Sequence, residues 1–368
     1  MEYRQLRKIL APVLIPASQG YAAFLRLRSR LFARGVKSSV KPEAFCISVG
    51  NISWGGSGKT PLVSWLLHWA HKHSLAPVVL TRGYGGKSSW RPLPVQAATD
   101  PAVSGDEPLM LAKMHPRALI LADPDRRRAL RWAGEHYSPG LYILDDGMQH
   151  LALQRDLNLV VLREEDLGAE WNKVIPAGSW REDKSALARA GAFLLRLPPD
   201  ADMSGSGVQR FLDNAAKKMA EFNVPLFSFQ LKALGLIPLR DWPEGAVQDM
   251  SGRTYALCTA VGNPESVRAG AGYLTGGPPA REFFFPDHHR FSLEDLKKIA
   301  GTKLPVIITA KDAVKIQLLR RELPGAEILV LHSAVEFGST RLLKPGGGFE
   351  DWLDARFAAY CHAGTEGF

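Results

Sequence analysis

Short apolar runs recur along the first half of the chain, and stretches with helical spacing lie between them. The runs are at 45–49, 76–80, 118–122, 141–144 and 158–162. Continuous apolar runs that alternate with helices are typical of strands buried on both faces of a parallel sheet. We therefore predict an α/β fold in which a mostly parallel sheet is sandwiched by helices.

The first run leads into a glycine-rich loop, SVGNISWGGSGKTP at 48–61, and then into an apolar stretch that predicts a helix. Strand, glycine loop and helix in this order form a phosphate-binding loop (P-loop), although Ser53 stands where the usual pattern has its first glycine. Glycines let backbone N–H groups surround phosphate oxygens, and the start of a helix favours an anion. An ordinary glycine-rich turn is the alternative interpretation.

This loop predicts a site for ATP and Mg²⁺. We expect Lys59 to act in catalysis on the β- and γ-phosphates, and the Thr60 hydroxyl to bind the metal. Asp145 and Asp146 follow the fourth run, at the strand end where such proteins hold Mg²⁺. A solvated strand end is the alternative for these two acids. The predicted nucleotide-binding residues are Gly55, Gly56, Ser57, Gly58, Lys59 and Thr60.

Further apolar runs at 254–261 and 306–309 follow a turn at 241–245, and they predict a second, smaller α/β domain. Ser292 and Asp295 have the spacing of a capping box at a helix start. A two-domain layout suggests closure of a cleft over ATP. The expected divisions are an N-terminal helix at 1–40, a P-loop kinase core at 41–230, the smaller domain at 245–340, and a segment at 341–368 that packs back on the core.

Residues 1–40 combine apolar segments with basic side chains, against the single acid Glu2. Pro12 and Pro16 interrupt the apolar run, which is shorter than the ~20 residues of a spanning helix. We predict a basic amphipathic helix that lies on an anionic membrane surface. A signal peptide and a solvated basic helix that packs on its own domain are the alternatives. The basic residues are Arg4, Arg7, Lys8, Arg26, Arg28, Arg30, Arg34 and Lys37.

The amino-acid composition is typical of a globular protein. A chain of 368 residues with 46% hydrophobic residues suits about two globular domains. Cys46, Cys258 and Cys361 are far apart, so they predict neither a disulfide framework nor a zinc site and fit a reducing cytoplasm. The net charge of +9 is concentrated at the front of the chain, so we expect no nucleic-acid partner. A non-catalytic module that binds anionic lipid or nucleic acid remains a rival interpretation.

Several denser motifs give a resemblance to a known family. They are the loop at 48–61, RGYGG at 82–86, GDEP at 105–108, DDGMQHLALQRD at 145–156 and FPDHH at 285–289. With them the chain resembles the tetraacyldisaccharide 4'-kinases, the lipid A 4'-kinases of Gram-negative bacteria. In that family a serine or threonine is normal at the position of Ser53. The resemblance extends from the first helix to about residue 315.

The resemblance implies ATP-dependent phosphorylation of the 4'-hydroxyl of a tetraacyldisaccharide 1-phosphate at the cytoplasmic face of the bacterial inner membrane. The acylated acceptor would stay in the bilayer, which agrees with a membrane-bound N-terminal helix. The residues assigned to acceptor binding are Arg82, Arg126, Gln149 and His150. Arg126 could equally form a plain ion pair.

The accepting hydroxyl needs a base, and Asp106 in the GDEP motif is our candidate. We expect His288 of the second domain to orient Asp106, so that the pair assembles when the domains meet. Glu107 beside it is expected to assist Mg²⁺ binding. The alternative is that Asp106 caps a helix and His288 is a loop histidine.

The chain departs from the family in two places. Ser179-Trp180 replaces Pro-Leu in the segment 175–182, which bears on the acceptor side, and Ala310 replaces a glutamate. The rival function within the same fold class is a membrane-associated P-loop ATPase or GTPase of another family. Such proteins carry an N-K-x-D motif or a second lysine early in the loop, and neither is present here.

Overall fold

The computed structural model describes residues 10–199, 201–322, 325–341 and 347–365. Its strands form one mixed sheet. They are β1 (Phe45–Asn51), β2 (Pro77–Thr81), β3 (Leu93–Val95), β4 (Leu119–Ala122), β5 (Leu141–Asp145), β6 (Leu157–Leu162), β7 (Ala192–Arg196), β8 (Leu226–Pro238), β9 (Ala256–Thr259), β10 (Arg281–Phe284), β11 (Val306–Thr309) and β12 (Ile328–Arg341).

The sheet has the strand order β10-β9-β11-β12-β8-β7-β6-β1-β5-β2-β4-β3. In the described residues β8 with β12 and β3 with β4 are antiparallel, and the other neighbouring pairs are parallel. The prediction of an α/β fold with a mostly parallel sheet is therefore confirmed.

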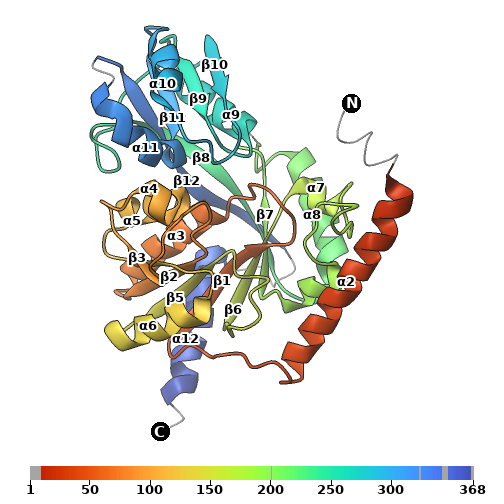
Figure 1. The fold of residues 1–368 in the computed structure, drawn as a ribbon. Coiled ribbons are helices and arrows are strands. Elements are labelled where there is room, and N and C mark those ends of the chain that lie inside the picture. Colours follow the sequence, from red (N-terminus) through yellow and green to blue (C-terminus); the bar gives the residue numbers. More distant parts are fainter. Residues whose placement is uncertain (1–9, 200, 323–324, 342–346, 366–368) are drawn as a thin grey trace.

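Helices cover both faces of this sheet (Figure 1). They are α2 (Ala11–Ala33), α3 (Lys59–Lys72), α4 (Pro101–Ser104), α5 (Asp106–Met114), α6 (Arg126–His136), α7 (Glu164–Leu167), α8 (Ser206–Met219), α9 (Pro264–Thr275), α10 (Leu293–Ala300), α11 (Ala310–Ile316) and α12 (Phe349–Thr365). In β1, Phe45 and Ile47 join one apolar core and Cys46 joins another. Because side chains alternate across a strand, both faces of β1 are buried, as its continuous apolar run predicted.

Two long strands connect the part of the molecule that contains β1 with the part that contains β9, β10 and β11 (Figure 1). β8 and β12 pair from Leu226 with Arg341 to Pro238 with Leu329. Figure 1 shows them leading from the part with β1 to the part with β9, β10 and β11. The sheet is thus continuous across 231–244, the region between the two predicted α/β domains.

The N-terminal helix α2 begins at Ala11 and continues through Pro16 to Ala33. Pro12 lies in the first turn, where its missing N–H is not needed, and Pro16 lies inside the helix. Residues 1–9 of the predicted segment lie outside the described residues. Within the described residues, no helix is both long and apolar enough to span a bilayer.

The C-terminal helix α12 lies against β1 and α3. The Phe45 and Phe357 rings are 5.5 Å apart, and Trp69 Nε1 donates to Asp354 Oδ1 over 2.7 Å. Phe349 and Leu353 are buried in the same core as β1. The last described helix therefore stabilises the strand and helix that flank the glycine loop.

Candidate active site

The glycine loop connects the end of β1 to the start of α3, the order that a phosphate-binding loop requires. Gly58 caps α3 with φ of 88°, a left-handed conformation that favours glycine. The Lys59 ammonium donates to Asn51 Oδ1 over 2.9 Å and lies 3.5 Å from Asp146 Oδ1. The Ser57 hydroxyl is buried and has no hydrogen-bond partner among the described residues, so it is free to meet a phosphate.

A loop at 174–182, here called the strap, holds the glycine loop from one side. Arg181 N donates to Ile52 O over 2.7 Å, and Trp54 N donates to Ser179 O over 2.9 Å. Trp180, which the sequence pattern marks as a departure from the family, is fully buried in an apolar cluster with Ile52 and Phe193. The substitution Ser179-Trp180 therefore lies in a packed support of the phosphate loop.

The two acids at the end of β5 differ in their partners. Asp146 accepts from Arg181 Nη1 over 2.8 Å and faces Lys59. Burial opposes its ionisation, but these two cations outweigh burial and lower the pKa of Asp146. Burial, with Glu107 and Asp146 nearby, raises the pKa of Asp145 to about 6. Asp145 Oδ1 is buried and unpartnered among the described residues, as a carboxylate that awaits a cation would be.

The GDEP motif places Asp106 as the first residue of α5. A Cβ on Gly105 would lie 2.4 Å from Tyr84 O, so the glycine lets GDEP approach the RGYGG loop that follows β2. Asp106 is 6% exposed. A carboxylate at the N-terminus of a helix is stabilised by the helix dipole.

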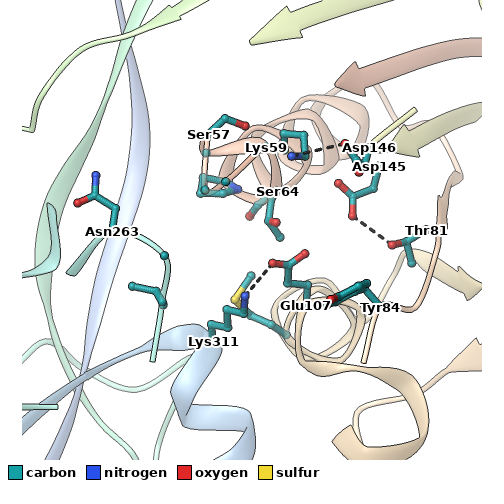
Figure 2. A pocket seen from close by; sticks show the side chains of 18 of the residues that line it. Ser57, Lys59, Ser64, Thr81, Tyr84, Glu107, Asp145, Asp146, Asn263 and Lys311 are labelled. Carbon is teal, nitrogen blue, oxygen red and sulfur yellow. Dashed lines mark hydrogen bonds and ion pairs between the residues drawn. The ribbon is translucent and has the colours of Figure 1, made fainter. Parts of the chain in front are cut away.

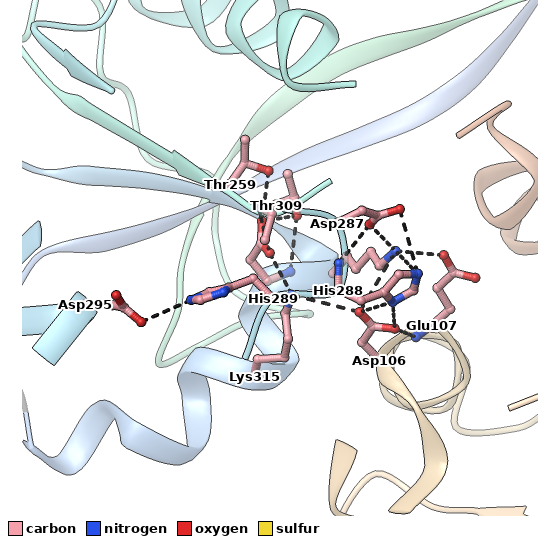
Figure 3. Close-up of polar contacts among 12 residues, drawn as sticks. Asp106, Glu107, Thr259, Asp287, His288, His289, Asp295, Thr309 and Lys315 are labelled. Carbon is pink, nitrogen blue, oxygen red and sulfur yellow. Dashed lines mark hydrogen bonds and ion pairs between the residues drawn. The ribbon is translucent and has the colours of Figure 1, made fainter. Parts of the chain in front are cut away.

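His288 comes from the loop between β10 and α10, and it meets Asp106 across the molecule (Figure 3). Its Nδ1 lies 3.0 Å from each Asp106 carboxylate oxygen. Burial would raise the pKa of Asp106, but the His288 hydrogen bond and the cations Lys311 and Lys315 outweigh burial, and the net pKa is lowered. The same hydrogen bond raises the pKa of His288.

Lys311 in α11 is a site residue that the sequence motifs did not predict. Its Nζ lies 3.0 Å from Glu107 Oε1, 3.0 Å from Asp287 Oδ1 and 3.3 Å from His288 Nε2. Burial would lower the pKa of Lys311, but the surrounding acids raise it above the ordinary value. Its place in TAKDAVK, next to the lost glutamate, was the available signal.

Glu107 is engaged by this lysine in the structure (Figure 2). The sequence assigned Glu107 to Mg²⁺ binding, and such a role would require it to exchange the Lys311 ammonium for the metal. Glu107 also raises the pKa of Asp145 through its charge. Glu107 and Asp145 therefore lie close enough to interact within the site.

The residues assigned to the acceptor lie beside Asp145 and Asp146. Arg126 is 5% exposed, and its Nη2 donates to Asp145 O over 3.4 Å. Burial and the charge of Arg126 lower the pKa of His150 to about 4, so its ring is neutral. Gln149 Nε2 donates to Asn51 O over 3.1 Å, and Arg82 follows β2 at the rim. Arg126 thus donates to the backbone carbonyls of Pro124 and Asp145, and among the residues that the structure describes it forms no side-chain ion pair.

One cavity of about 1410 Å³ connects most of these groups, and Asp106 is not part of its lining. The lining includes Ser57, Lys59, Arg82, Glu107, Arg126, Asp145, Asp146, Gln149, His150, Arg181, His288 and Lys311. Figure 2 shows Lys59 and Ser57 on one side, Glu107 and Tyr84 on another, and Lys311 and Asn263 from the C-terminal half. At one end the cavity reaches Tyr21, Leu25 and Arg28 of α2. The space is large enough for a nucleotide together with part of a second substrate.

A phosphate loop, strand-end acids and an opposing buried carboxylate define a P-loop phosphotransferase. Comparison with known proteins also identifies a kinase family. The model of the family described as tetraacyldisaccharide-1-P 4'-kinase matches residues 10–345. The chain belongs to the tetraacyldisaccharide 4'-kinase family, whose members act in lipid A biosynthesis.

Individual relatives cover nearly the whole chain. The tetraacyldisaccharide 4'-kinase of Nitratidesulfovibrio vulgaris is 41% identical over 97% of both chains, and that of Haemophilus influenzae is 34% identical over 83% of both. A crystal structure of LpxK from Aquifex aeolicus in complex with ATP matches with a TM-score of 0.72 and 26% identity, over 96% of this chain and 99% of that one.

Proposed function

We propose that this enzyme transfers the γ-phosphate of ATP to the 4'-hydroxyl of a tetraacyldisaccharide 1-phosphate, at the cytoplasmic face of the bacterial inner membrane. The observation that carries this proposal is the buried Asp106, bonded to His288 beside the cavity into which the phosphate loop opens. A phosphate donor and a base for an acceptor hydroxyl are thereby brought to one site.

In the proposed reaction, the acceptor oxygen attacks the γ-phosphorus in line with the leaving oxygen of ADP. A new O–P bond forms, the bond between the γ-phosphorus and the β,γ-bridging oxygen breaks, and ADP leaves with that electron pair. Asp106 accepts the proton of the hydroxyl, and His288 orients the carboxylate. Lys59 stabilises charge on the β- and γ-phosphates.

The site also fits Mg²⁺. The Thr60 hydroxyl, Asp145 and Asp146 would supply the hard oxygen ligands that this ion prefers, and Asp145 Oδ1, which has no partner among the described residues, would be available to it. Within the described residues, no group of three His, Cys, Asp or Glu side chains forms a ready metal site. Mg²⁺ bound there would neutralise negative charge on the substrate phosphates.

We further propose that α2 binds an anionic membrane and presents the lipid acceptor to the cavity. Val13, Phe24 and Leu27 expose 71%, 61% and 55% of their surfaces. Tyr21, Leu25 and Arg28 of the same helix line the cavity, so an acceptor bound along α2 would enter the site directly. Arg82, Arg126, Gln149 and His150 are proposed to bind its polar part.

Transfer of labelled γ-phosphate from ATP to a purified disaccharide 1-phosphate tests this function. We expect a product phosphorylated at the 4' position, and stronger thermal stabilisation by Mg-ATP than by Mg-GTP, since ligand binding stabilises the folded state. Nucleotide hydrolysis without transfer to the lipid would favour a P-loop ATPase or GTPase of another kind. Lipid binding without any stabilisation by nucleotide would favour a non-catalytic module.

A further inference from the structure

The ring of His288 lies between two charged groups of opposite sign. Nδ1 is 3.0 Å from the Asp106 carboxylate, and Nε2 is 3.3 Å from the Lys311 ammonium. An ammonium group can only donate hydrogen bonds, so Nε2 must carry a lone pair to accept from it. The proton of the neutral ring then lies on Nδ1 and is donated to Asp106.

Other groups around the ring favour a second proton. Asp287 Oδ2 is 3.8 Å from Nε2, and Asp106 is on the opposite side. The Tyr84 ring packs against the His288 ring with 5.1 Å between their centroids, and Lys315 Nζ lies 3.9 Å from Asp106 Oδ2. The hydrogen bond to Asp106 raises the pKa of His288; burial and the charge of Lys311 oppose this rise, and the net pKa lies above its ordinary value.

Lys311 is itself held in place by acids. It is ion-paired to Glu107 and Asp287, both at 3.0 Å, and its side chain is 13% exposed. These contacts keep it charged and directed at Nε2. Glu107 belongs to α5 and Asp287 to the C-terminal half, so the position of Lys311 depends on both parts of the molecule.

We propose that Lys311 is a positioning residue that opposes protonation of His288 on Nε2, so that the neutral ring carries its proton on Nδ1. In this form His288 donates one hydrogen bond to Asp106 and adds no further positive charge to those of Lys311 and Lys315 beside it. Asp106 then retains its basicity toward the acceptor hydroxyl. The consequence for catalysis rests on the proposed function of Asp106 as the base. The protonation state of the His288 ring is independent of that function.

The experiment is a pH titration of ¹⁵N-histidine-labelled full-length protein by NMR, with His288 assigned by the loss of its signals in His288→Gln. In the parent we expect a neutral form with a protonated Nδ1 and an unprotonated Nε2. In Lys311→Met the titration midpoint of His288 should rise by about one unit or more, because the opposing charge is removed. Lys311→Arg should restore most of the parental midpoint, since a guanidinium also only donates.

Lys315→Met is the matched control, because it removes a positive charge close to Asp106 without removing a group from Nε2. It should leave the midpoint within roughly half a unit of the parent. Circular dichroism and thermal unfolding of each variant verify its fold. A neutral ring protonated on Nε2 in the parent, or an unchanged or lowered midpoint in folded Lys311→Met, would overturn the proposal.

The kinetic arm separates this inference from the proposed function. The acidic limb of the kcat profile should move to higher pH in Lys311→Met, by about the shift seen in the NMR midpoint. If the midpoint moves and the acidic limb does not, Lys311 still controls His288, and the role of Asp106 as the base is wrong. If neither moves, the inference about Lys311 is wrong whatever Asp106 does.

Discussion

Lys59 is the residue whose chemistry the phosphate loop most directly requires. Its ammonium faces Asn51 and Asp146 at the start of α3, in a position to contact the β- and γ-phosphates. We expect Lys59→Ala to lower kcat by about 10³-fold, because a cation that stabilises the transferring phosphate is lost. The fold should remain intact by circular dichroism. Turnover within about tenfold of the parent would contradict the assignment.

Many residues of the site could be predicted from the sequence, but their contact partners could not. Lys59, Thr60 and Asp145 could be predicted because their order along the chain follows the chemistry of a nucleotide site. The engagement of Glu107 by Lys311 could not be predicted, because residues 107 and 311 meet only through the packing of α11 on α5. The motif that contains Lys311 gives no indication of which acid it meets.

At the scale of elements, the strap is the support that the sequence pattern did not reveal. Its backbone pairs with Ile52 and Trp54 of the glycine loop, and a Cβ on Gly178 would lie 1.8 Å from Lys173 O. Strand, loop and helix were predictable from local apolar spacing. The pairing of the strap was not, because hydrogen bonds between distant backbone segments leave no periodic trace in the sequence.

Gly178→Ala should therefore displace the strap and loosen the glycine loop. We expect a raised KM for ATP and a lower Tm, by several degrees, measured by steady-state kinetics and calorimetry. Gly134→Ala is the control, because a Cβ at Gly134 in α6 meets nothing within 4 Å. An unaltered KM and Tm in Gly178→Ala would show that the strap does not support the loop.

The helix α2 is the element proposed to meet the membrane. We expect the triple variant Val13→Glu, Phe24→Glu, Leu27→Glu to lose binding to anionic vesicles by at least about tenfold, since apolar area and charge both drive such binding. Vesicle sedimentation measures the loss, and the KM for lipid should rise more than that for ATP.

The matched control is a second triple variant, which introduces three glutamates at exposed apolar residues outside α2. Val247→Glu, Tyr273→Glu and Leu318→Glu alter positions that are 58%, 74% and 61% exposed. Equal vesicle binding by the parent and the α2 variant would remove the membrane role of this helix.

On the scale of the whole molecule, β8 and β12 join the part that carries the phosphate loop to the part that carries His288 and Lys311. Asp106 and His288 are 182 residues apart and lie in hydrogen-bond contact. The fold class followed from apolar runs and motifs, whereas the continuity of the sheet depends on long-range pairing of β8 with β12. We expect movement of these strands to control when the two residues meet.

The central claim is that Asp106 and His288 act as one unit, and a double-mutant cycle tests it most directly. With Asp106→Ala, His288→Ala and the double variant, we measure kcat for phosphate transfer to the lipid acceptor. Each single change should lower kcat by about 10²-fold or more with little change in the KM for ATP, and the double variant should lose much less than the product of the two. Losses that multiply independently, or near-parental kcat in either folded single variant, would contradict the claim.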